Sequence, residues 1–368
     1  MNFSELTHQI EIRDSLDKIL TKHCSQDTLK KFDLEFKHDK KLLSVLSKNG
    51  YLGLGISEEF GGSGKDLYDL GILFESLGYH AAPLYLSGCL VDVAQTIQKF
   101  SENPIHTSIL SSIVKGEIYT SAILEPYNQD PENPITNAEI SKDRLIISGT
   151  KFLSELASEA KDILVSANSN KGVLLVLIDK EKLKLTKLSS TANSPIFKVE
   201  INKVSVDKSA VIHGEGRGLE ALRFLLQINM VMRSYTALGI TEKMTSLIAS
   251  YTSERKQFGR VIGSFQAVSH KAADCFINLE CLRLVNQQAA INLNTNLDCE
   301  NDALIAKIWA GNTCHKISYS AQHLHGGAGV DKDYLLWRYC LLAKECELIN
   351  GSVIQNIDRL GINITSNQ

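Results

Sequence analysis

The sequence predicts an α+β fold in which a helical N-terminal domain (residues 1–115), a small antiparallel β domain (116–214) and a C-terminal helical bundle (215–368) follow one another. The hydrophobic period supports this order, because it is helical, then alternating, then helical again. Gly and Pro number 24 and 6 among 368 residues, about 8% against about 12% in average proteins, which favours long helices. Strands do not alternate with helices, so no Rossmann-type sheet is expected.

The first region carries apolar residues at helical spacing in residues 42–55 and again in residues 69–79. Between these stretches, the glycine-rich segment 58–64 predicts a loop, and Pro83 predicts a break after the second stretch. The region is therefore expected to consist of several helices that are joined by loops.

The second region contains short segments rich in β-branched residues, which is typical of strands. In its last segment, Phe197, Val199 and Ile201 alternate with polar residues, and Val204 and Val206 continue the alternation after a break. Such alternation indicates a strand with one side in a core and the other side in solvent.

The third region returns to helical spacing and keeps it to about residue 362. Leucines at 219, 222, 225 and 226 begin a long amphipathic stretch. The longest interruption, residues 293–302, is rich in Asn and Asp and predicts a connection between two helices. A bundle of long helices is expected.

Composition and charge restrict the function. A hydrophobic fraction of 43% and a charged fraction of 22% indicate an ordinary folded protein, and a net charge of −3 gives no basic excess for binding nucleic acid. Eight cysteines without a CxxC pair indicate reduced thiols rather than disulfides or a zinc site. Neither a signal-peptide core nor a long apolar run is present, so the sequence predicts a cytoplasmic protein without a membrane span.

Residues 253–274 carry a candidate anion site. Arg255, Lys256 and Arg260 fall near the predicted end of one helix, and Gln266 begins the next. Arg binds phosphate through two parallel hydrogen bonds, and Gln bonds sugar or phosphate oxygens. A basic helix end also has a purely structural explanation, because cations stabilise the C-terminal end of a helix dipole.

Two further segments interrupt the bundle. Residues 326–329 read Gly-Gly-Ala-Gly, and the backbone of such a loop can approach an anion closely, although glycines at helix ends are more often caps. His323 and His325 precede this loop, but two His at that spacing without further ligands make a poor metal site, and no metal is expected. Residues 350–352 are typical of a helix end followed by a new N-cap.

Taken together, these three segments resemble the acyl-CoA dehydrogenase family, and the likeness runs along nearly the whole chain. Residues 51–83 are similar to the family's N-terminal stretch around "P-E-x-x-G-G", residues 123–126 to its "T-E-P" strand, and residues 149–167 to its "G-x-K-x-[WF]-I-T" strand. The resemblance implies an acyl-CoA dehydrogenase-like fold, with a C-terminal four-helix bundle, that forms dimers or tetramers. Members bind FAD between protomers and desaturate acyl-CoA thioesters at the α,β bond.

The resemblance also implies which residues bind FAD. In the family, the β domain of one protomer contacts the flavin, and its neighbour contacts the pyrophosphate and adenosine. The positions that serve the neighbour's cofactor are Arg255, Phe258, Gln266, Gly326, Gly327 and Gly329. The family's adenosine-binding Gln falls on His323, with Gln322 one place earlier. Ser154 stands at the position of the Thr that bonds flavin N5, and Phe152 at the aromatic position beside it.

The family's chemistry requires a carboxylate that removes the α-proton while hydride passes to the flavin. The two positions at which members place this Glu hold Asn350 and Asn229 here. Asn accepts no proton at useful pH, so no catalytic residue is predicted. Glu347 and Glu242 are the nearest candidates for a displaced base.

The site for the chain's own thioester departs from the family pattern as well, since the acyl-CoA-binding "D-x-x-R" reads Gln227 and Met230 and the "E-P-x-A-G-S-D" loop lacks Gly-Ser-Asp. The sequence therefore predicts a non-catalytic subunit that completes the FAD site of a catalytic homologue, similar to subunits from bacterial steroid side-chain degradation. The expected partners are that homologous subunit, which would bind most of the acyl-CoA, and electron-transferring flavoprotein. Two alternatives stay open: an active homo-oligomer with a displaced base, and a flavin-free scaffold.

Overall fold

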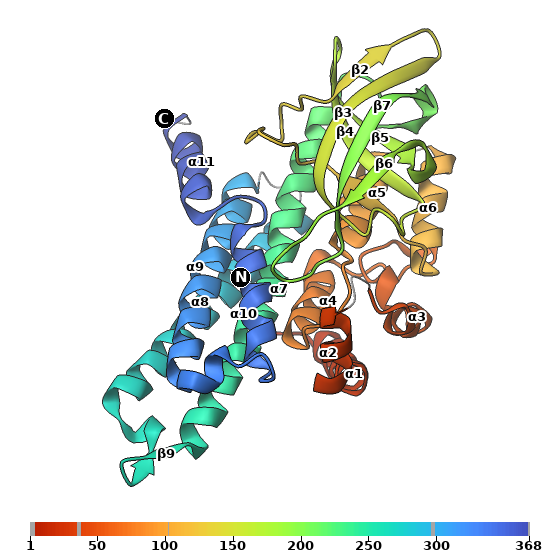
Figure 1. Ribbon diagram of the computed structural model, residues 1–368. Helices are drawn as coiled ribbons and strands as arrows, with labels where there is room; N and C mark the ends of the chain where they lie inside the picture. The colour runs from red at the N-terminus through yellow and green to blue at the C-terminus, as the bar shows by residue number, and fades with distance from the viewer. Residues whose placement is uncertain (1–3, 35–37, 102, 296–298, 367–368) are drawn as a thin grey trace. The chain divides into compact units, whose positions relative to one another are not determined.

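The computed structural model describes residues 4–34, 38–101, 103–295 and 299–366 (Figure 1). The predicted order of helices, strands and helices is present along the chain. The chain folds into two compact units, the first from Met1–Asp33, Leu67–Ala82 and Met230–Gln368, the second from Leu34–Asp66 and Pro83–Asn229. Within the described ranges, no helix combines the length and the apolar character that crossing a membrane requires.

The first unit is built almost entirely from α-helices. They are α1 (Thr7–His23), α2 (Gln26–Leu34), α4 (Leu67–Tyr79), α7 (Gly218–Glu254), α8 (Gln266–Asn294), α9 (Glu300–His325), α10 (Leu336–Leu348) and α11 (Val353–Ser366). Of these, α7 begins in the second unit and enters the first at Met230. The predicted connection at 293–302 joins α8 to α9, although residues 296–298 lie outside the described ranges.

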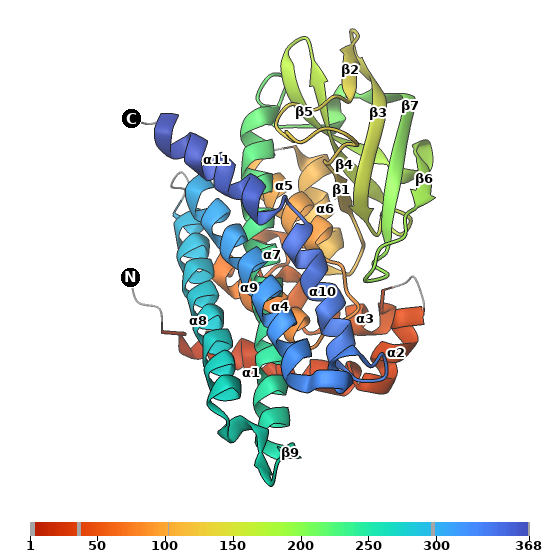
Figure 2. The same cartoon turned by 60° about the vertical axis from the view of Figure 1, so that its left-hand side comes forward.

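Helix α9 is the centre of the bundle, because it contacts α8, α10 and α11 (Figure 2). Small buried residues on α9, including Ala303, Ala306 and Ala310, let its neighbours approach closely. At Gly311, an added Cβ would lie 2.6 Å from a methyl group of Val353 on α11. The small residues of α9 thus allow close packing on several sides of this helix, in agreement with the predicted bundle.

Helices α4 and α7 cross at glycines. A Cβ added at Gly78 would lie 2.2 Å from the carbonyl oxygen of Thr236, and one added at Gly239 would lie 1.9 Å from the carbonyl oxygen of Glu75. Both distances are far below van der Waals contact, so each position requires the absence of a side chain. The two backbones therefore meet directly at this crossing.

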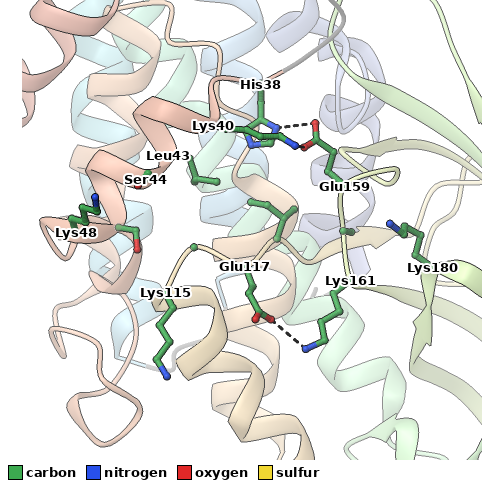
Figure 3. A pocket seen from close by; sticks show the side chains of 14 residues that line it. His38, Lys40, Leu43, Ser44, Lys48, Lys115, Glu117, Glu159, Lys161 and Lys180 are labelled. Atoms are coloured by element: carbon green, nitrogen blue, oxygen red, sulfur yellow. Dashed lines mark hydrogen bonds and ion pairs between the residues drawn. The ribbon is translucent and has the colours of Figure 1, made fainter.

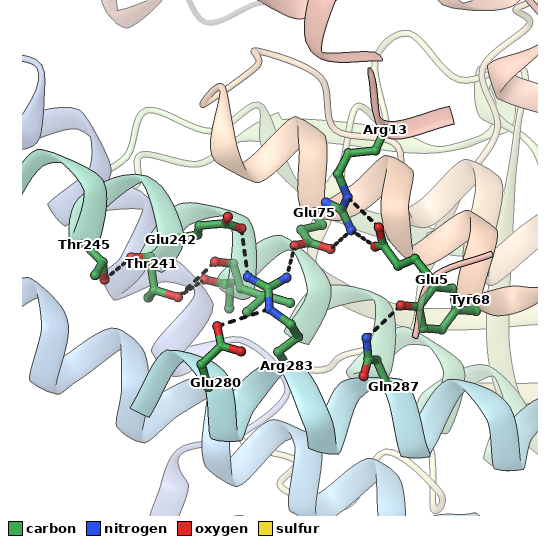
Figure 4. A network of polar contacts seen from close by, with 12 residues as sticks. Glu5, Arg13, Tyr68, Glu75, Thr241, Glu242, Thr245, Glu280, Arg283 and Gln287 are labelled. Carbon is green, nitrogen blue, oxygen red and sulfur yellow. Dashed lines mark hydrogen bonds and ion pairs between the residues drawn. The ribbon is translucent and has the colours of Figure 1, made fainter. Parts of the chain in front are cut away.

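A network of charged side chains ties four helices of this unit together (Figure 4). At its centre, the Glu75 carboxylate of α4 accepts hydrogen bonds from Arg13 of α1 at 3.0 Å and from Arg283 of α8 at 2.7 Å. Arg283 also pairs with Glu242 of α7 at 3.2 Å and with Glu280 at 3.4 Å. Burial by itself lowers the pKa of Arg283, but the negative charges and hydrogen bonds of Glu75 and Glu242 outweigh burial and raise that pKa. The Arg283 guanidinium therefore stays charged.

The second unit contains an eight-stranded sheet in the order β6-β7-β3-β2-β4-β5-β8, with β1 beside β4. The strands are β1 (Thr120–Ala122), β2 (Asn137–Ile140), β3 (Arg144–Glu155), β4 (Asp162–Ser169), β5 (Gly172–Asp179), β6 (Lys184–Lys187), β7 (Ile196–Asp207) and β8 (Val211–Ile212). Most pairs are antiparallel, as predicted, but β1 runs parallel to β4, so the sheet is mixed. Alternation along single strands cannot reveal this direction, because it is set by the chain's path between them.

The helices of this unit are α3 (Lys40–Lys48), the π-helix η3 (Ser87–Val93), α5 (Ala94–Phe100) and α6 (Pro104–Val114). The alternation predicted for the last strand is confirmed, since Phe197, Val199, Ile201, Val204 and Val206 are all buried. The break after the third of them is a β-bulge, where two residues of β7 oppose one of β3.

Candidate functional site

The first predicted anion site forms a small hairpin after α7. Strands β9 (Lys256–Gln257) and β10 (Arg260–Val261) pair through a two-residue turn, and Phe258 and Gly259 in the turn both have positive φ, 50° and 78°. Such φ values match the right-handed twist of a tight hairpin. The Phe258 ring is 92% exposed. The hairpin therefore presents an aromatic ring next to a cationic strand.

Arg255 lies at the base of this hairpin, where its carbonyl accepts a hydrogen bond from Ile262 at 2.8 Å. Its side chain is exposed, and so is that of Gln266 at the start of α8. The guanidinium of Arg260 lies 4.0 Å from the centre of the Phe265 ring, a cation–π contact that orients the second strand. Arg255, Gln266 and Phe258 are thus all exposed.

The second predicted site, the glycine loop, forms a 3₁₀ turn, η7 (Gly326–Val330), directly after α9. Gly326 has φ 57° and ψ −133°, a backbone conformation that is open to glycine alone. An added Cβ at Gly326 or Gly327 would meet nothing within 4 Å, whereas one at Gly329 would lie 2.6 Å from the carbonyl oxygen of Gln322. Gly329 therefore serves packing, while the first two glycines expose bare backbone.

The structure brings these two motifs together through His325. Its ring stacks on Tyr251 in the last turns of α7, with 4.4 Å between the ring centres, and its Nδ1 donates to the carbonyl oxygen of Ala321 at 2.7 Å. Burial lowers the pKa of His325, so the ring is neutral and packs as an aromatic group. His323 is exposed and stacks beside Tyr319 instead. No group of three His, Cys, Asp or Glu suited to a metal occurs among the described residues.

In the second unit, Phe152 and Ser154 lie at the end of β3, where a bulge against β7 places Leu153 at φ 58°. Ser154 is buried, and its hydroxyl donates to the carbonyl oxygen of Ser121 at 2.7 Å. Phe152 is partly exposed, and its N–H donates to Leu124 at 2.8 Å. The bulge therefore gives the two predicted residues different surroundings.

A buried ion pair fixes β3 next to these residues. Lys151, 0% exposed, donates from Nζ to Glu125 at 2.8 Å and to the Ser166 hydroxyl at 3.0 Å. Burial by itself raises the pKa of Glu125, but hydrogen bonds from Lys151 and from the backbone of Thr136 and Ile135 outweigh it and lower that pKa to about 2. The pair ties the loop after β1 to the strand that carries Ser154.

The two Asn that the resemblance places at the family's base positions are held differently. Asn229 is buried on α7 and donates from Nδ2 to Asp92 at 2.6 Å and to the Ser87 hydroxyl at 3.2 Å. Asn350 lies between α10 and α11 with φ 61°, and its carbonyl oxygen accepts a hydrogen bond from Asn356 at 3.2 Å. The predicted helix end is confirmed here, because Ser352 and Gln355 form a reciprocal N-cap of α11.

Asp92 is a candidate that sequence reasoning missed. It lies buried on η3 and accepts hydrogen bonds from Asn229 at 2.6 Å and from the Ser121 hydroxyl at 2.5 Å. Since Ser154 donates to the carbonyl of that same Ser121, one chain of hydrogen bonds joins Asn229 to Ser154. In the sequence, Asp92 lies within the mostly apolar segment Ser87–Val93. Nothing in that segment indicates a functional site.

The two Glu considered as displaced bases are committed elsewhere. Glu242 belongs to the Arg283 network, and burial raises its pKa. Glu347 pairs with Lys344 and lies 3.5 Å from His315. Both carboxylates already have cationic or imidazole partners, so neither is poised to take a proton from a ligand.

Comparisons with known proteins show what the chain as a whole is similar to. The family models of the acyl-CoA dehydrogenase N-terminal and C-terminal domains match residues 7–117 and 216–353. The chain is 26% identical to acyl-CoA dehydrogenase FadE27 of Mycobacterium tuberculosis, over 98% of both chains. Among solved structures, it is similar to a variant of the steroid ACAD Tcur3481–Tcur3483 (30% identity, TM-score 0.91, 98% of both chains) and to the ChsE4–ChsE5 complex of M. tuberculosis (26%, 0.93, 99% of both).

Proposed function

The chain belongs to the acyl-CoA dehydrogenase family, and we propose that it is a subunit that completes the FAD site of a catalytic homologue without supplying a catalytic base. One contrast carries the proposal. The Arg255 hairpin and the Gly326 loop are both exposed and offer hydrogen-bond donors, whereas the two positions that the resemblance assigns to the base hold amides, Asn229 and Asn350. Two similar solved structures support this proposal, because one is named as a steroid ACAD and the other as the ChsE4–ChsE5 complex. In this proposal, the chain forms a heteromer that acts on bulky CoA thioesters.

The described residues fit FAD, the family's cofactor. The bare backbone of Gly326 and Gly327 would leave room for the pyrophosphate of a partner-bound FAD, and the Arg255 guanidinium would supply a charge-assisted hydrogen bond to it. Gln266 and Phe258 flank the same surface, and Ser154 keeps a hydroxyl oxygen that can accept from a flavin N–H. FAD, when bound, accepts the hydride that leaves the β-carbon of the thioester.

In this proposal, the chain's residues bind and orient, and the partner moves the proton. Asn229 and Asn350 can donate or accept hydrogen bonds but hold no exchangeable proton at neutral pH. Gln322 and His323, at the start of the glycine loop, would contact the adenosine. The expected electron acceptor is electron-transferring flavoprotein.

Flavin stoichiometry tests the proposal. We expect little FAD in the chain expressed alone and about one FAD per two chains in a complex with a catalytic homologue. Because one charge-assisted hydrogen bond contributes about 1.5–3 kcal/mol, Arg255→Ala should weaken FAD binding by the complex about 10–100-fold. Arg144→Ala, which removes an exposed Arg that bonds only Ser205 among the described contacts, is the control. One FAD per chain without a partner, or a colourless protein with every partner, would contradict the proposal.

Asp92 favours a second candidate, an active homo-oligomer with a displaced base, because it is a carboxylate in direct contact with Asn229. If the partner supplies the base, Asp92→Asn should change the turnover of the complex less than about threefold, since the amide preserves shape and one acceptor. Turnover and FAD content are measured together, with Ser87→Ala as the control for disturbing the same network. A loss of about 100-fold or more with normal FAD content would assign the proton transfer to this chain.

A further inference from the structure

The second unit contains a pocket that the proposed function does not use (Figure 3). Its volume is about 650 Å³, and it lies among α3, the segment 115–118, the turn between β3 and β4, and Lys180 at the end of β5. This volume falls in the range of small-molecule sites. None of the residues predicted to bind FAD lines it.

The pocket is strongly cationic in a chain whose net charge is −3. Its charged lining consists of five lysines and two glutamates, Lys40, Lys48, Lys115, Lys161, Lys180, Glu117 and Glu159. With five positive and two negative groups, the lining carries a net charge of +3. Figure 3 shows Lys48 and Lys115 on one side of the pocket and Lys161 and Lys180 on the other. An anion inside would therefore have cations on both sides.

The two glutamates compensate only part of this charge. Glu159 pairs with Lys40 at 2.8 Å, and Glu117 pairs with Lys161 at 3.3 Å. Outside the lining, Glu181 pairs with Lys180 at 3.3 Å. Lys48 and Lys115 are exposed and make no ion pair with any residue in the described part of the chain. Two unpaired ammonium groups beside one pocket repel each other, and an anionic ligand relieves that repulsion.

His38 adds a neutral acceptor to the pocket lining. Its side chain is 2% exposed, and its Nδ1 lies 3.1 Å from Glu159, which as a carboxylate can only accept the hydrogen bond. Burial lowers the pKa of His38 in spite of Glu159, so the ring is neutral at pH 7 and its Nε2 is an acceptor. That nitrogen is buried and has no hydrogen-bond partner among the described residues. A ligand O–H or N–H group would satisfy it.

We propose that this pocket binds a phosphate-bearing small molecule of nucleotide size. Lys is a compact point charge suited to phosphate, and Lys48 and Lys115, which have no ion pair among the described residues, can serve several phosphate oxygens, with Lys161 and Lys180 on the opposite side. The volume is too large for inorganic phosphate alone, and His38 fits a hydroxyl or amino group on the remainder of the ligand. The lining residues of the pocket all differ from the residues predicted to bind FAD.

The test is equilibrium binding of ADP to the full-length chain, with adenosine as the uncharged probe. We expect saturable ADP binding that falls at least about tenfold in Lys48→Gln/Lys115→Gln. The matched control Lys18→Gln/Lys142→Gln removes the same charge from exposed positions outside the pocket and should change the affinity less than about twofold. Equal binding of adenosine, or no saturable binding of ADP, would overturn the proposal.

ADP is also half of FAD, so Arg255→Ala is measured in parallel. Binding that survives Arg255→Ala and is lost in the double lysine variant supports the pocket. The opposite result would place ADP on the flavin surface and overturn the proposed site. Circular dichroism and an unchanged melting temperature confirm that each variant is folded.

Discussion

Replacing Lys151 with Met is expected to lower the free energy of unfolding by about 3–5 kcal/mol, because the change leaves the Glu125 carboxylate buried without its cation. Met preserves most of the volume of the side chain, so the loss reports the charge rather than a cavity. Urea unfolding followed by circular dichroism at pH 7 measures it. The double variant Lys151→Met/Glu125→Gln should recover part of the loss, since it removes the stranded charge.

The same pair predicts a pH dependence. The pKa of Glu125 is about 2, below its ordinary value of 4.5. The ionised carboxylate therefore stabilises the fold above about pH 4.5, and this contribution is lost as the pH falls towards 2. In Lys151→Met, the pKa of Glu125 rises and stability should vary less over that interval.

An exposed pair provides the comparison for Lys151. Lys184 lies 3.1 Å from Glu200 at the surface, with 68% of its side chain exposed. Lys184→Gln should lower the free energy of unfolding by less than about 1 kcal/mol, because solvent screens such a pair. Equal losses in the two variants would contradict the role assigned to burial.

Glu75→Ala is expected to lower the free energy of unfolding by about 3 kcal/mol, because it removes the carboxylate shared by Arg13 and Arg283. Both guanidiniums keep other partners, Glu5 for the first and Glu242 for the second, which limits the loss. Chemical unfolding at low and high salt measures the effect. Salt should change it little, since a buried network is weakly screened.

Glu280 is the matched control, because it pairs with the same Arg283 but is 42% exposed. Glu280→Ala should cost less than about 1 kcal/mol. Glu75→Gln keeps one hydrogen-bond acceptor, so its free energy of unfolding should lie between those of Glu75→Ala and Glu280→Ala. If Glu75→Ala were no more destabilising than the control, the network would be a surface feature rather than the connection between α1, α4 and α8.

The parts of the fold that depend on local pattern could be predicted from the sequence. The alternation of Phe197, Val199 and Ile201 indicates a strand, and the helical period that returns after residue 215 indicates long helices. The packing of α4 against the bundle could not be predicted in this way. It depends on Gly78 and Gly239, whose missing side chains matter only once the two helices meet.

In the candidate site, too, features within one short segment could be predicted, and contacts between distant segments could not. The exposed Arg255 hairpin and the glycine loop each occupy one short segment, so a family motif can point to each of them from the sequence. Asp92 could not be found, because it lies within a short apolar segment and its partners Ser121 and Asn229 are 29 and 137 positions away. His325 was considered only as a metal ligand, since nothing in the sequence shows that Tyr251 lies against it.

The backbone at Asn350 has a consequence for the evolution of the family. Its φ of 61° lies in the left-handed region, which Asn adopts more easily than other residues with a side chain. A reversion to Glu would place an ordinary side chain in this conformation, at a cost of about 1 kcal/mol or more before any chemistry is regained. If the chain is the non-catalytic subunit proposed above, a carboxylate at this position is therefore costly to regain, and the local backbone favours continued dependence on a catalytic sister.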